Sequence, residues 1–431
     1  MSDTLRSLFS GSKNNANSNA NTGSGSSFGS QGKGASSFDD DVTAPSSSGS
    51  SSGYQEVRPE IAPSAVIRVI GIGGGGTNAV ARMISSKVGG VEFIAVNTDA
   101  QALFHNAAAT KVNIGRGTTR GLGAGANPDI GLQSAKESSE ELKKVMEGAD
   151  LIFITAGLGG GTGSGAAPYI AELARSMGIL TVGVVTRPFS FEGLRRRKQA
   201  DESLEALRSK VDTLITIPND KVLSLIDKTT PLTEAFQIVD EILRHGIEGI
   251  ASLITVHGLV NVDFADVRSV MQDAGSALMG IGYGTGDSRA SEAARAAVDS
   301  PLLELSISGA KGILFNITGG NDMSMFEVDE AARIVTEAAD PEANIIFGAV
   351  IDDAYTGQVK CTVIATGFEE KKDSPTTVAS PSMLRGVPAF KKIQDQAKAD
   401  RPDEAVLKMA GQQLNEEELE VPTFMRKKIG K

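Results

Sequence analysis

The chain has 431 residues, a single cysteine and a formal net charge of −11 at pH 7. Its length allows more than one domain, its acidic balance argues against nucleic acid as a partner, and its single cysteine excludes a disulfide framework. Three scattered histidines are too few for a metal cluster. No apolar run approaches the roughly 20 residues that a transmembrane helix needs.

Composition divides the chain into a central part and two flanks. Residues 1–63 are rich in Ser, Gly and Asn, so we expect a disordered arm that cannot bury a core. Residues 64–368 are rich in Val, Ile, Ala and Gly. Residues 369–413 turn to Lys, Asp, Ser, Pro and Ala and predict a flexible linker. Residues 414–431 carry an acidic run, a small apolar cluster and a basic end.

The first half of the central part alternates strand-like and helix-like segments. Helical patterns at 77–86, 166–177 and 201–210 lie between apolar runs that each end in Gly, Pro or Asn. This alternation predicts a Rossmann-like α/β domain over 64–230, with a parallel sheet covered on both faces. Ligands of such sheets bind at the carboxyl ends of the strands. The apolar runs are 65–73, 91–97, 149–157, 179–188 and 213–219.

A long helix is predicted over 231–257, within a central-helix segment 231–258. Pro231 suits its first turn and Gly258 suits a C-cap. Beyond it, four strand-like runs and two helical patterns (291–300 and 327–339) predict a smaller α+β domain over 259–368. The helix carries an apolar stripe that should face the core: Leu232, Phe236, Val239, Leu243, Ile247, Ile250 and Ile254. The four strand-like runs are 277–284, 312–320, 344–352 and 361–368.

The first strand runs into a glycine-rich turn, GIGGGGTNAV. Gly71, Gly73 and Gly76 satisfy G-x-G-x-x-G, and Asp99 follows at the distance expected of a ribose-binding acid. One interpretation is therefore an NAD-dependent Rossmann oxidoreductase. Another is a tight strand-to-helix turn without a ligand.

A second glycine cluster, GLGGGTGSG at 157–165, also lies between a strand and a helix but lacks the lysine of the common P-loop. Two such loops on neighbouring strands offer enough backbone N–H groups for a triphosphate. The small-residue segment 120–128, RGLGAGANP, could close over the terminal phosphate, or it could be a mobile surface loop.

Together these motifs resemble the tubulin/FtsZ family. GGGTGSG is similar to the tubulin signature loop, and GIGGGGTNAV is similar to the first nucleotide loop of the FtsZ branch, the bacterial cell-division proteins. The motifs NTDAQAL, PFSFEG, IPND and NVDFADV follow in FtsZ order, so the resemblance covers 64–368 and the C-terminal tip. It implies a cytoskeletal GTPase that assembles head to tail in the cytoplasm, at the mid-cell division ring.

The resemblance also implies a GTP/GDP site with Mg²⁺ on the nucleotide. Glu192 would accept hydrogen bonds from ribose hydroxyls, and Arg196 would neutralise phosphate charge, although 193–198 could be only a solvated helix start. Asn219, Phe236 and Asp240 would bind guanine; from periodicity alone Phe236 belongs to the core. The residues that would surround the phosphates are Gly74, Gly75, Gly76, Thr77, Asn78, Ala124, Gly125, Ala126, Gly161, Thr162 and Gly163.

NVDFADV, at 261–267, matches the stretch that carries the family's catalytic acids. The resemblance implies that Asp263 and Asp266, with Asn261 alongside, act on the nucleotide of the adjacent subunit. Their spacing of three puts both carboxylates on one helical face, where they can position and polarise water. Without the resemblance, Asp263 is interpreted as a helix N-cap. A GTP-binding scaffold without hydrolysis is a further alternative, against which these intact acids argue.

The C-terminal tip, EVPTFMRKK at 420–428, resembles the family's adaptor-binding peptide. It implies division adaptors or membrane-tethering proteins as partners, through a segment that folds on binding. The family commonly has Asp and Leu where this chain has Glu420 and Met425. Composition alone predicts a disordered tail.

Overall fold

The computed structural model describes residues 65–368, apart from six residues within that range, and they belong to one compact unit. The predicted arm, linker and C-terminal tip lie outside the described residues, as does Asn261. The other residues left out are Leu225, Lys228, His257, Glu304 and Leu305.

Six strands of the first half form a parallel sheet in the order β3-β2-β1-β4-β5-β6. Ile70 of the first strand lies opposite Ile94 on one side and Ile154 on the other. All five predicted strands are present, and β3 is an additional short one. The strands are β1 (Ile67–Ile72), β2 (Glu92–Asn97), β3 (Thr110–Asn113), β4 (Leu151–Gly157), β5 (Leu180–Arg187) and β6 (Thr213–Pro218).

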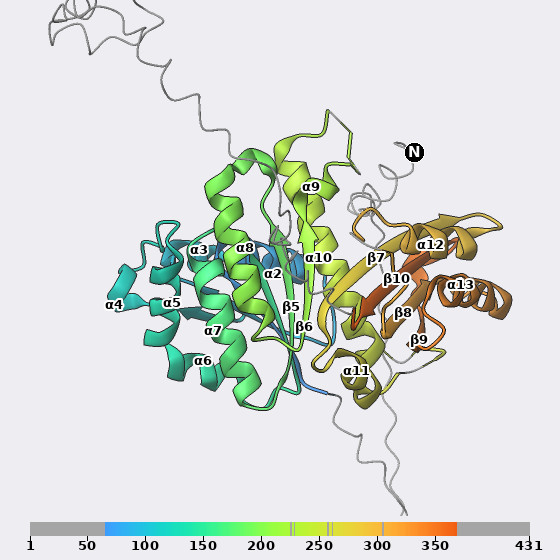
Figure 1. Cartoon of the computed structure of the whole chain (residues 1–431), viewed down its shortest axis with the longest axis horizontal. Helices are drawn as coiled ribbons and strands as arrows, with labels where there is room; N and C mark the ends of the chain where they lie inside the picture. Colours follow the sequence, from blue (N-terminus) through green and yellow to red (C-terminus); the bar gives the residue numbers. More distant parts are fainter. Residues whose placement is uncertain are drawn as a thin grey trace, which may run out of the picture. The chain divides into compact units, whose positions relative to one another are not determined.

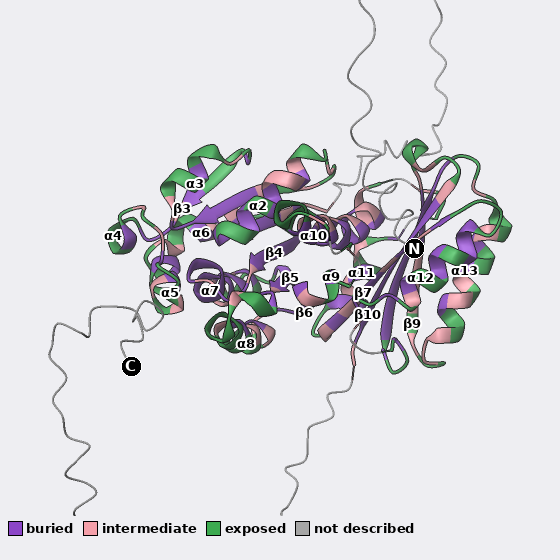
Figure 2. Cartoon of the chain, turned by 90° about the horizontal axis from the view of Figure 1, so that it is seen from above, coloured by how far each residue is buried: buried purple, intermediate pink, exposed green. Residues whose placement is uncertain are grey.

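Helices cover both faces of this sheet, as Figure 2 shows for α2 (Gly73–Ser85) and α10 (Leu232–Thr255) on one face and α7 (Thr162–Ser176) and α8 (Leu194–Arg208) on the other. Alternate residues of each strand point to opposite faces of the sheet, and the helices on each face bury them. Val69 packs with the α10 side, whereas Ile70 packs with the α7 side. Shorter helices complete this half: α3 (Ala100–His105), α4 (Arg116–Thr119), α5 (Pro128–Glu137), α6 (Ser139–Met146), η1 (Ser190–Glu192) and α9 (Asn219–Val222).

The long helix α10 lies between the two halves of the sheet (Figure 1). Its predicted apolar stripe is buried from Val239 through Ile250, but Leu232 is 59% and Phe236 is 42% exposed, so the prediction was wrong for the first turns. These two side chains extend past the core. Pro231 is the N-cap rather than a first-turn residue.

The C-terminal end of α10 also differs from the prediction. The helix ends at Thr255, and the extended Val256 is its C-cap, so Gly258 does not cap it. The chain then crosses the second half of the sheet, where Val260 bridges to Ala349. A Cβ on Gly258 would lie 2.2 Å from the Ala349 carbonyl oxygen, so close packing accounts for this glycine.

The second half of the sheet continues from the first. Strand β7 (Gly275–Thr285) pairs with β6 in parallel and with β10 antiparallel, and the order continues as β7-β10-β8-β9. The described strands therefore form one sheet, and the boundaries 64–230, 231–258 and 259–368 stay a prediction. Helices α12 and α13 cover the face opposite α10 (Figure 2). The remaining elements are α11 (Phe264–Met271), α12 (Arg289–Val298), β8 (Gly312–Gly319), α13 (Met325–Ala338), β9 (Asn344–Ile351), η2 (Asp353–Tyr355) and β10 (Gln358–Thr366).

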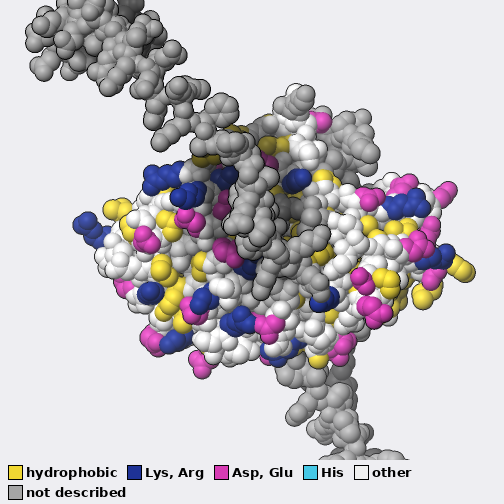
Figure 3. All heavy atoms as spheres, viewed as in Figure 1, with side chains coloured by type: hydrophobic (Ala, Val, Ile, Leu, Met, Phe, Trp, Pro, Cys, Tyr) yellow, Lys and Arg dark blue, Asp and Glu magenta, His cyan; other side chains and the backbone are white. Residues whose placement is uncertain are grey.

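The surface carries charge of both signs. On the face drawn in Figure 3, Lys and Arg side chains are interspersed with Asp and Glu side chains. Within the described part of the chain, no helix combines the length and the apolar character that crossing a membrane requires. The architecture confirms the predicted α/β class, with a largely parallel sheet and a smaller second part.

Candidate nucleotide site

Two glycine loops lie side by side at the carboxyl ends of β1 and β4. These strands are neighbours, with Ile72 opposite Ala156. Helix α2 begins directly after β1, and α7 begins at Thr162 after the second loop. Neither helix has a side-chain cap on its N-terminus, since neither Ile72 nor Gly161 makes such a bond. Two uncapped helix N-termini aimed at one place form a binding site for a polyanion.

Close packing between the loops explains several of the glycines. A Cβ on Gly73, whose φ is +70°, would lie 2.9 Å from the Gly163 nitrogen. A Cβ on Gly163 would lie 2.8 Å from the Gly157 carbonyl oxygen, and one on Gly76 would lie 2.3 Å from that of Thr155. These glycines let the two loops pack closely, and the predicted phosphate contacts of Gly76 and Gly163 stay a prediction.

Other predicted residues of the first loop face outward. Gly74, Gly75 and Asn78 are exposed, and a Cβ on Gly74 would meet no atom within 4 Å. Thr77 is buried, and its hydroxyl donates to the Gly73 carbonyl oxygen. The exposed Gly74 and Gly75 are therefore the positions at which a phosphate can approach bare backbone.

The third predicted segment, 120–128, contacts the second glycine loop. Ala124 is buried, and a Cβ on Gly161 would lie 2.9 Å from the Ala124 Cβ. Gly125 and Ala126 both adopt left-handed backbone, with φ of 57° and 59°. This conformation is unfavourable for alanine, so the segment is held in a specific shape beside the cradle.

Three side chains in and beside the glycine loops, those of Thr98, Asp99 and Thr162, are already bonded within the protein. The Thr162 hydroxyl lies 2.6 Å from that of Thr98, and both residues are buried. Asp99 caps α3 by accepting hydrogen bonds from the Gln101 and Ala102 amides. The acid expected of a dinucleotide site is thus used as a helix cap, which argues against the NAD interpretation.

Glu192 and Arg196, predicted to bind ribose and phosphate separately, form an ion pair with each other. Glu192 also accepts a hydrogen bond from the Phe189 amide at 2.9 Å. Arg197, which belongs to the basic stretch 193–198, lies 3.2 Å from the Asp220 carboxylate. Asp220 was not predicted as part of the site; it also accepts from the Ser190 amide, which fixes η1 against α9.

The three residues predicted to bind the base lie directly after β6, where Asn219 begins α9, and in the first turns of α10, where Phe236 and Asp240 lie. Asn219 is buried, and its Oδ1 has no hydrogen-bond partner. Phe236 is half-exposed and meets Phe189 edge to face, with ring centroids 5.4 Å apart. Asp240 follows one turn later on α10. A buried acceptor without a partner fits a ligand that brings a donor.

Asp240 is paired with a residue that the sequence did not predict. Its Oδ2 lies 3.3 Å from Nε of Arg82, in the last turn of α2. Burial raises the pKa of Asp240 to about 6, and the Arg82 charge opposes that rise. The two residues are 158 positions apart, so no local pattern connects them.

The predicted catalytic acids lie at the other end of α10. Asp263 caps α11 by accepting a hydrogen bond from the Asp266 amide at 2.7 Å, as the capping interpretation predicts, and both residues are exposed. At about 1.5 Å per residue, the stretch of α10 from Asp240 to Thr255 is about 22 Å long. In Figure 1, α9 marks the upper end of α10 and α11 lies at its lower end. The structure therefore does not bring these acids to the glycine loops of the same chain.

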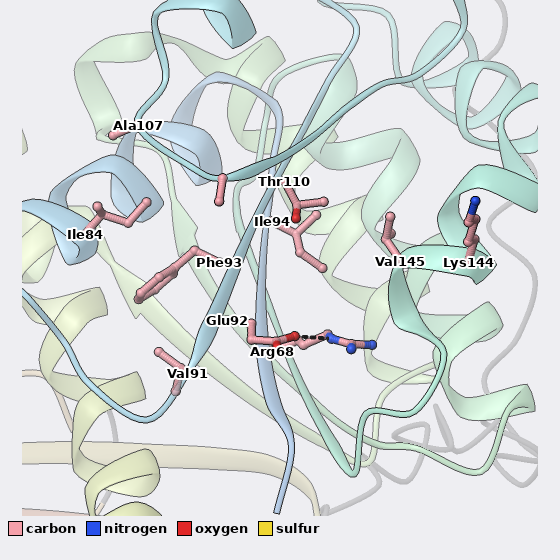
Figure 4. Close-up of a pocket in the computed structure, with 11 residues that line it drawn as sticks. Arg68, Ile84, Val91, Glu92, Phe93, Ile94, Ala107, Thr110, Lys144 and Val145 are labelled. Atoms are coloured by element: carbon pink, nitrogen blue, oxygen red, sulfur yellow. Dashed lines mark hydrogen bonds and ion pairs between the residues drawn. The ribbon is translucent and has the colours of Figure 1, made fainter.

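A separate cavity of about 550 Å³ lies at the amino ends of β1, β2 and β3, and Figure 4 shows the residues that line it. The glycine loops lie at the opposite, carboxyl ends of the strands. Arg68 and Glu92 form an ion pair of 2.7 Å along its wall. None of the predicted site residues lines it. Among the described residues, no group of three or more His, Cys, Asp or Glu side chains could hold a metal ion.

Comparison with known proteins agrees with this geometry. Residues 66–227 match the Tubulin/FtsZ family, GTPase domain, and residues 275–369 match the FtsZ family, C-terminal domain. The empty FtsZ dimer of M. jannaschii is 46% identical with a TM-score of 0.68, over 70% of this chain and 88% of that chain. A structure of a mutant of the same protein gives the same identity and TM-score over 91% of that chain.

A more distant structure shares the fold. It is the GTPγS-bound protofilament of CetZ2 from Haloferax volcanii, at 22% identity and a TM-score of 0.61, over 71% of this chain and 94% of that chain. The fold and the cradle define a GTPase that binds GTP and GDP. The chain belongs to the tubulin/FtsZ family.

Proposed function

We propose that the chain is a bacterial cell-division protein of the FtsZ type, which polymerises head to tail at the mid-cell ring in the cytoplasm. One observation carries this proposal: the glycine loops and the acids of 261–267 lie at opposite ends of α10. A single chain therefore binds GTP without bringing those acids to it. A second copy stacked on the first would place its acids over the nucleotide, and such a heterologous contact propagates into a filament.

In this proposal the upper end of one subunit binds and orients GTP. Backbone N–H groups around Gly74, Gly75 and the start of α7 would hold the phosphates. Phe236 would stack on guanine while Asn219 and Asp240 read its edge. Glu192 would turn to the ribose and Arg196 to a phosphate, which requires their ion pair to open. Mg²⁺ would be held chiefly by the phosphates themselves.

The lower end of the next subunit would supply hydrolysis. Asp263 and Asp266, with Asn261, would orient and polarise the attacking water. Loss of the terminal phosphate would relax the segment 120–128 and weaken the contact between subunits. The tip at 420–428 would connect filaments to division adaptors or membrane-tethering proteins.

The test is phosphate release from GTP, with magnesium, over a range of protein concentrations. If the site is completed between subunits, specific activity is near zero at low concentration and rises above a threshold. Constant activity per molecule would contradict the proposal, because it would place the catalytic groups within one chain. No release at any concentration would favour a scaffold that binds GTP without hydrolysing it.

A further inference from the structure

Arg82 is the cation that faces the Asp240 carboxylate. The Arg82 side chain is 32% exposed and that of Asp240 is 17% exposed, so the pair is shielded from water on much of its surface. The other charge acting on Asp240 is that of Glu241, its neighbour on α10, which itself pairs with Arg244 at 2.7 Å. Arg82 and Glu241 therefore act on Asp240 in opposite directions.

Guanine is matched best by an ionised Asp240. Guanine presents a ring N–H beside an exocyclic amine, and the two oxygens of a carboxylate accept from both at once. Burial favours the protonated form, in which one of these two acceptor oxygens becomes a donor and faces a guanine donor. Arg82 Nε takes up Oδ2 from the α2 side and leaves the rest of the carboxylate's acceptor capacity for a ligand.

Arg82 lies on the same helix as the glycines proposed to face the phosphates, so one rigid element connects the base end and the phosphate end of the site. The arginine is in the last turn of α2, whose first turn contains the exposed Gly74 and Gly75. The distance along the helix from Gly74 to Arg82 is about 12 Å. A cation in the last turn of a helix is also favoured by the helix dipole.

We propose that Arg82 is the positioning residue that makes this site selective for guanine, by holding Asp240 ionised and oriented toward the base. This inference rests on the proposed function, in which Asp240 reads the base. Arg82 does not itself contact the nucleotide. Its role is therefore visible in how binding depends on pH and on the 2-amino group of the base.

The experiment measures the Kd of GTP and of inosine triphosphate, which lacks the 2-amino group, between pH 6 and pH 8. The proteins compared are the parent chain, Arg82→Gln, Arg82→Lys and Arg333→Gln. Arg333 makes an exposed ion pair on α13 and serves as the matched loss of one arginine. Circular dichroism checks that each variant is folded.

In the parent, GTP binding should weaken about twofold from pH 8 to pH 6, because about half of Asp240 becomes protonated. In Arg82→Gln the same change should weaken it about tenfold, and the preference for GTP over inosine triphosphate should shrink at pH 6 and return at pH 8. Arg82→Lys and Arg333→Gln should behave as the parent does. If Arg82→Gln instead weakens GTP binding equally at every pH and keeps the preference for GTP over inosine triphosphate, Arg82 has only a structural role and the inference is wrong.

Two further variants keep the outcome decisive. Burial is the main cause of the raised pKa of Asp240, and the Glu241 charge adds to it. Glu241→Gln should therefore flatten the pH dependence of GTP binding slightly. A steeper dependence would contradict control of Asp240 by neighbouring charges, even if Arg82→Gln does not fold. Asp240→Asn should lose the preference for GTP. If it keeps that preference, Asp240 does not read the base and that part of the proposed function fails. If it loses the preference while Arg82→Gln matches the parent, only the inference about Arg82 fails.

Discussion

The two ends of α10 are built in different ways. At the upper end, the two glycine loops and β4 pack so closely that a single Cβ on Gly73, Gly76 or Gly163 would approach backbone atoms within 3 Å. At the lower end, Asp263 and Asp266 are exposed, and the Asp263 carboxylate caps the start of α11. In the proposed function, binding is therefore specified within one chain, while hydrolysis needs groups from a second chain. The predictions below test this contrast.

The largest effect is expected at the lower end. Asp266→Ala should reduce GTP turnover about 100-fold or more, the range of a lost acid–base group, and leave GTP affinity within about twofold. Phosphate release and equilibrium nucleotide binding measure the two quantities. Asp287→Ala, at an exposed acid in the turn before α12, is the matched control and should leave both unchanged. Full turnover in Asp266→Ala would remove this residue from the mechanism.

A smaller effect is expected at the open side of the cradle. Gly74→Ala meets no atom of the protein, so the free energy of unfolding without nucleotide should not fall. GTP affinity should nevertheless drop about 30-fold, because the added methyl group would keep the phosphate away from the backbone and break a charge-assisted hydrogen bond that contributes about 2 kcal/mol. Gly89→Ala, at another glycine with open surroundings, should change neither quantity. Unchanged affinity in Gly74→Ala would show that the phosphates lie elsewhere.

Base stacking should contribute less. Phe236→Ala removes a half-exposed ring and should weaken GTP binding about tenfold, in keeping with the loss of one aromatic stacking contact. Titration with a fluorescent GTP analogue checks this. Phe326→Ala, at an exposed ring on α13, provides the comparison and should bind as the parent does. Equal affinities for the two variants would contradict a base pocket at Phe236.

The smallest effect concerns stability. The pKa of Asp240 is raised in the folded protein from 3.8 to about 6, so its contribution to stability is full below pH 3.8 and is lost as pH rises through 6. As pH rises from 5.5 to 7.5, the contribution of Asp240 to the free energy of unfolding should therefore fall by about 1 kcal/mol. Asp240→Asn should remove this pH-dependent fall in the free energy of unfolding, whereas Asp287→Asn should keep it. Urea unfolding of the nucleotide-free protein at both pH values measures the difference, and an unchanged slope in Asp240→Asn would argue against a buried carboxylate.

The sequence was sufficient for the parts of the fold that depend on long apolar runs. The strands predicted at 65–73, 149–157 and 179–188 are present because each is buried on both faces. The short strand Thr110–Asn113 was missed because its sequence, TKVN, has too little apolar pattern. The end of α10 was misplaced because a pairing with β9, distant in the chain, ends the helix before Gly258.

For the site, the sequence motifs indicated which residues belong to it, but not which of their side chains form ion pairs or hydrogen bonds with one another. The pair Glu192–Arg196 has the i, i+4 spacing of a helical ion pair, so this contact could have been predicted. The pair Arg82–Asp240 could not, because only the packing of α2 on α10 brings the two together. Likewise Thr98 and Thr162 meet only through the order of the strands.

The most direct test of the split site is a mixing experiment with two defective chains. Asp266→Ala binds GTP but lacks the acid, and Gly74→Val keeps the acid but blocks the cradle at a position with no protein neighbours. Phosphate release is measured for each variant alone and for an equimolar mixture at the same total concentration. If one subunit's acids act on the next subunit's GTP, the mixture hydrolyses far more than the mean of the two. If the mixture only equals that mean, the acids act within their own chain and the head-to-tail account is wrong.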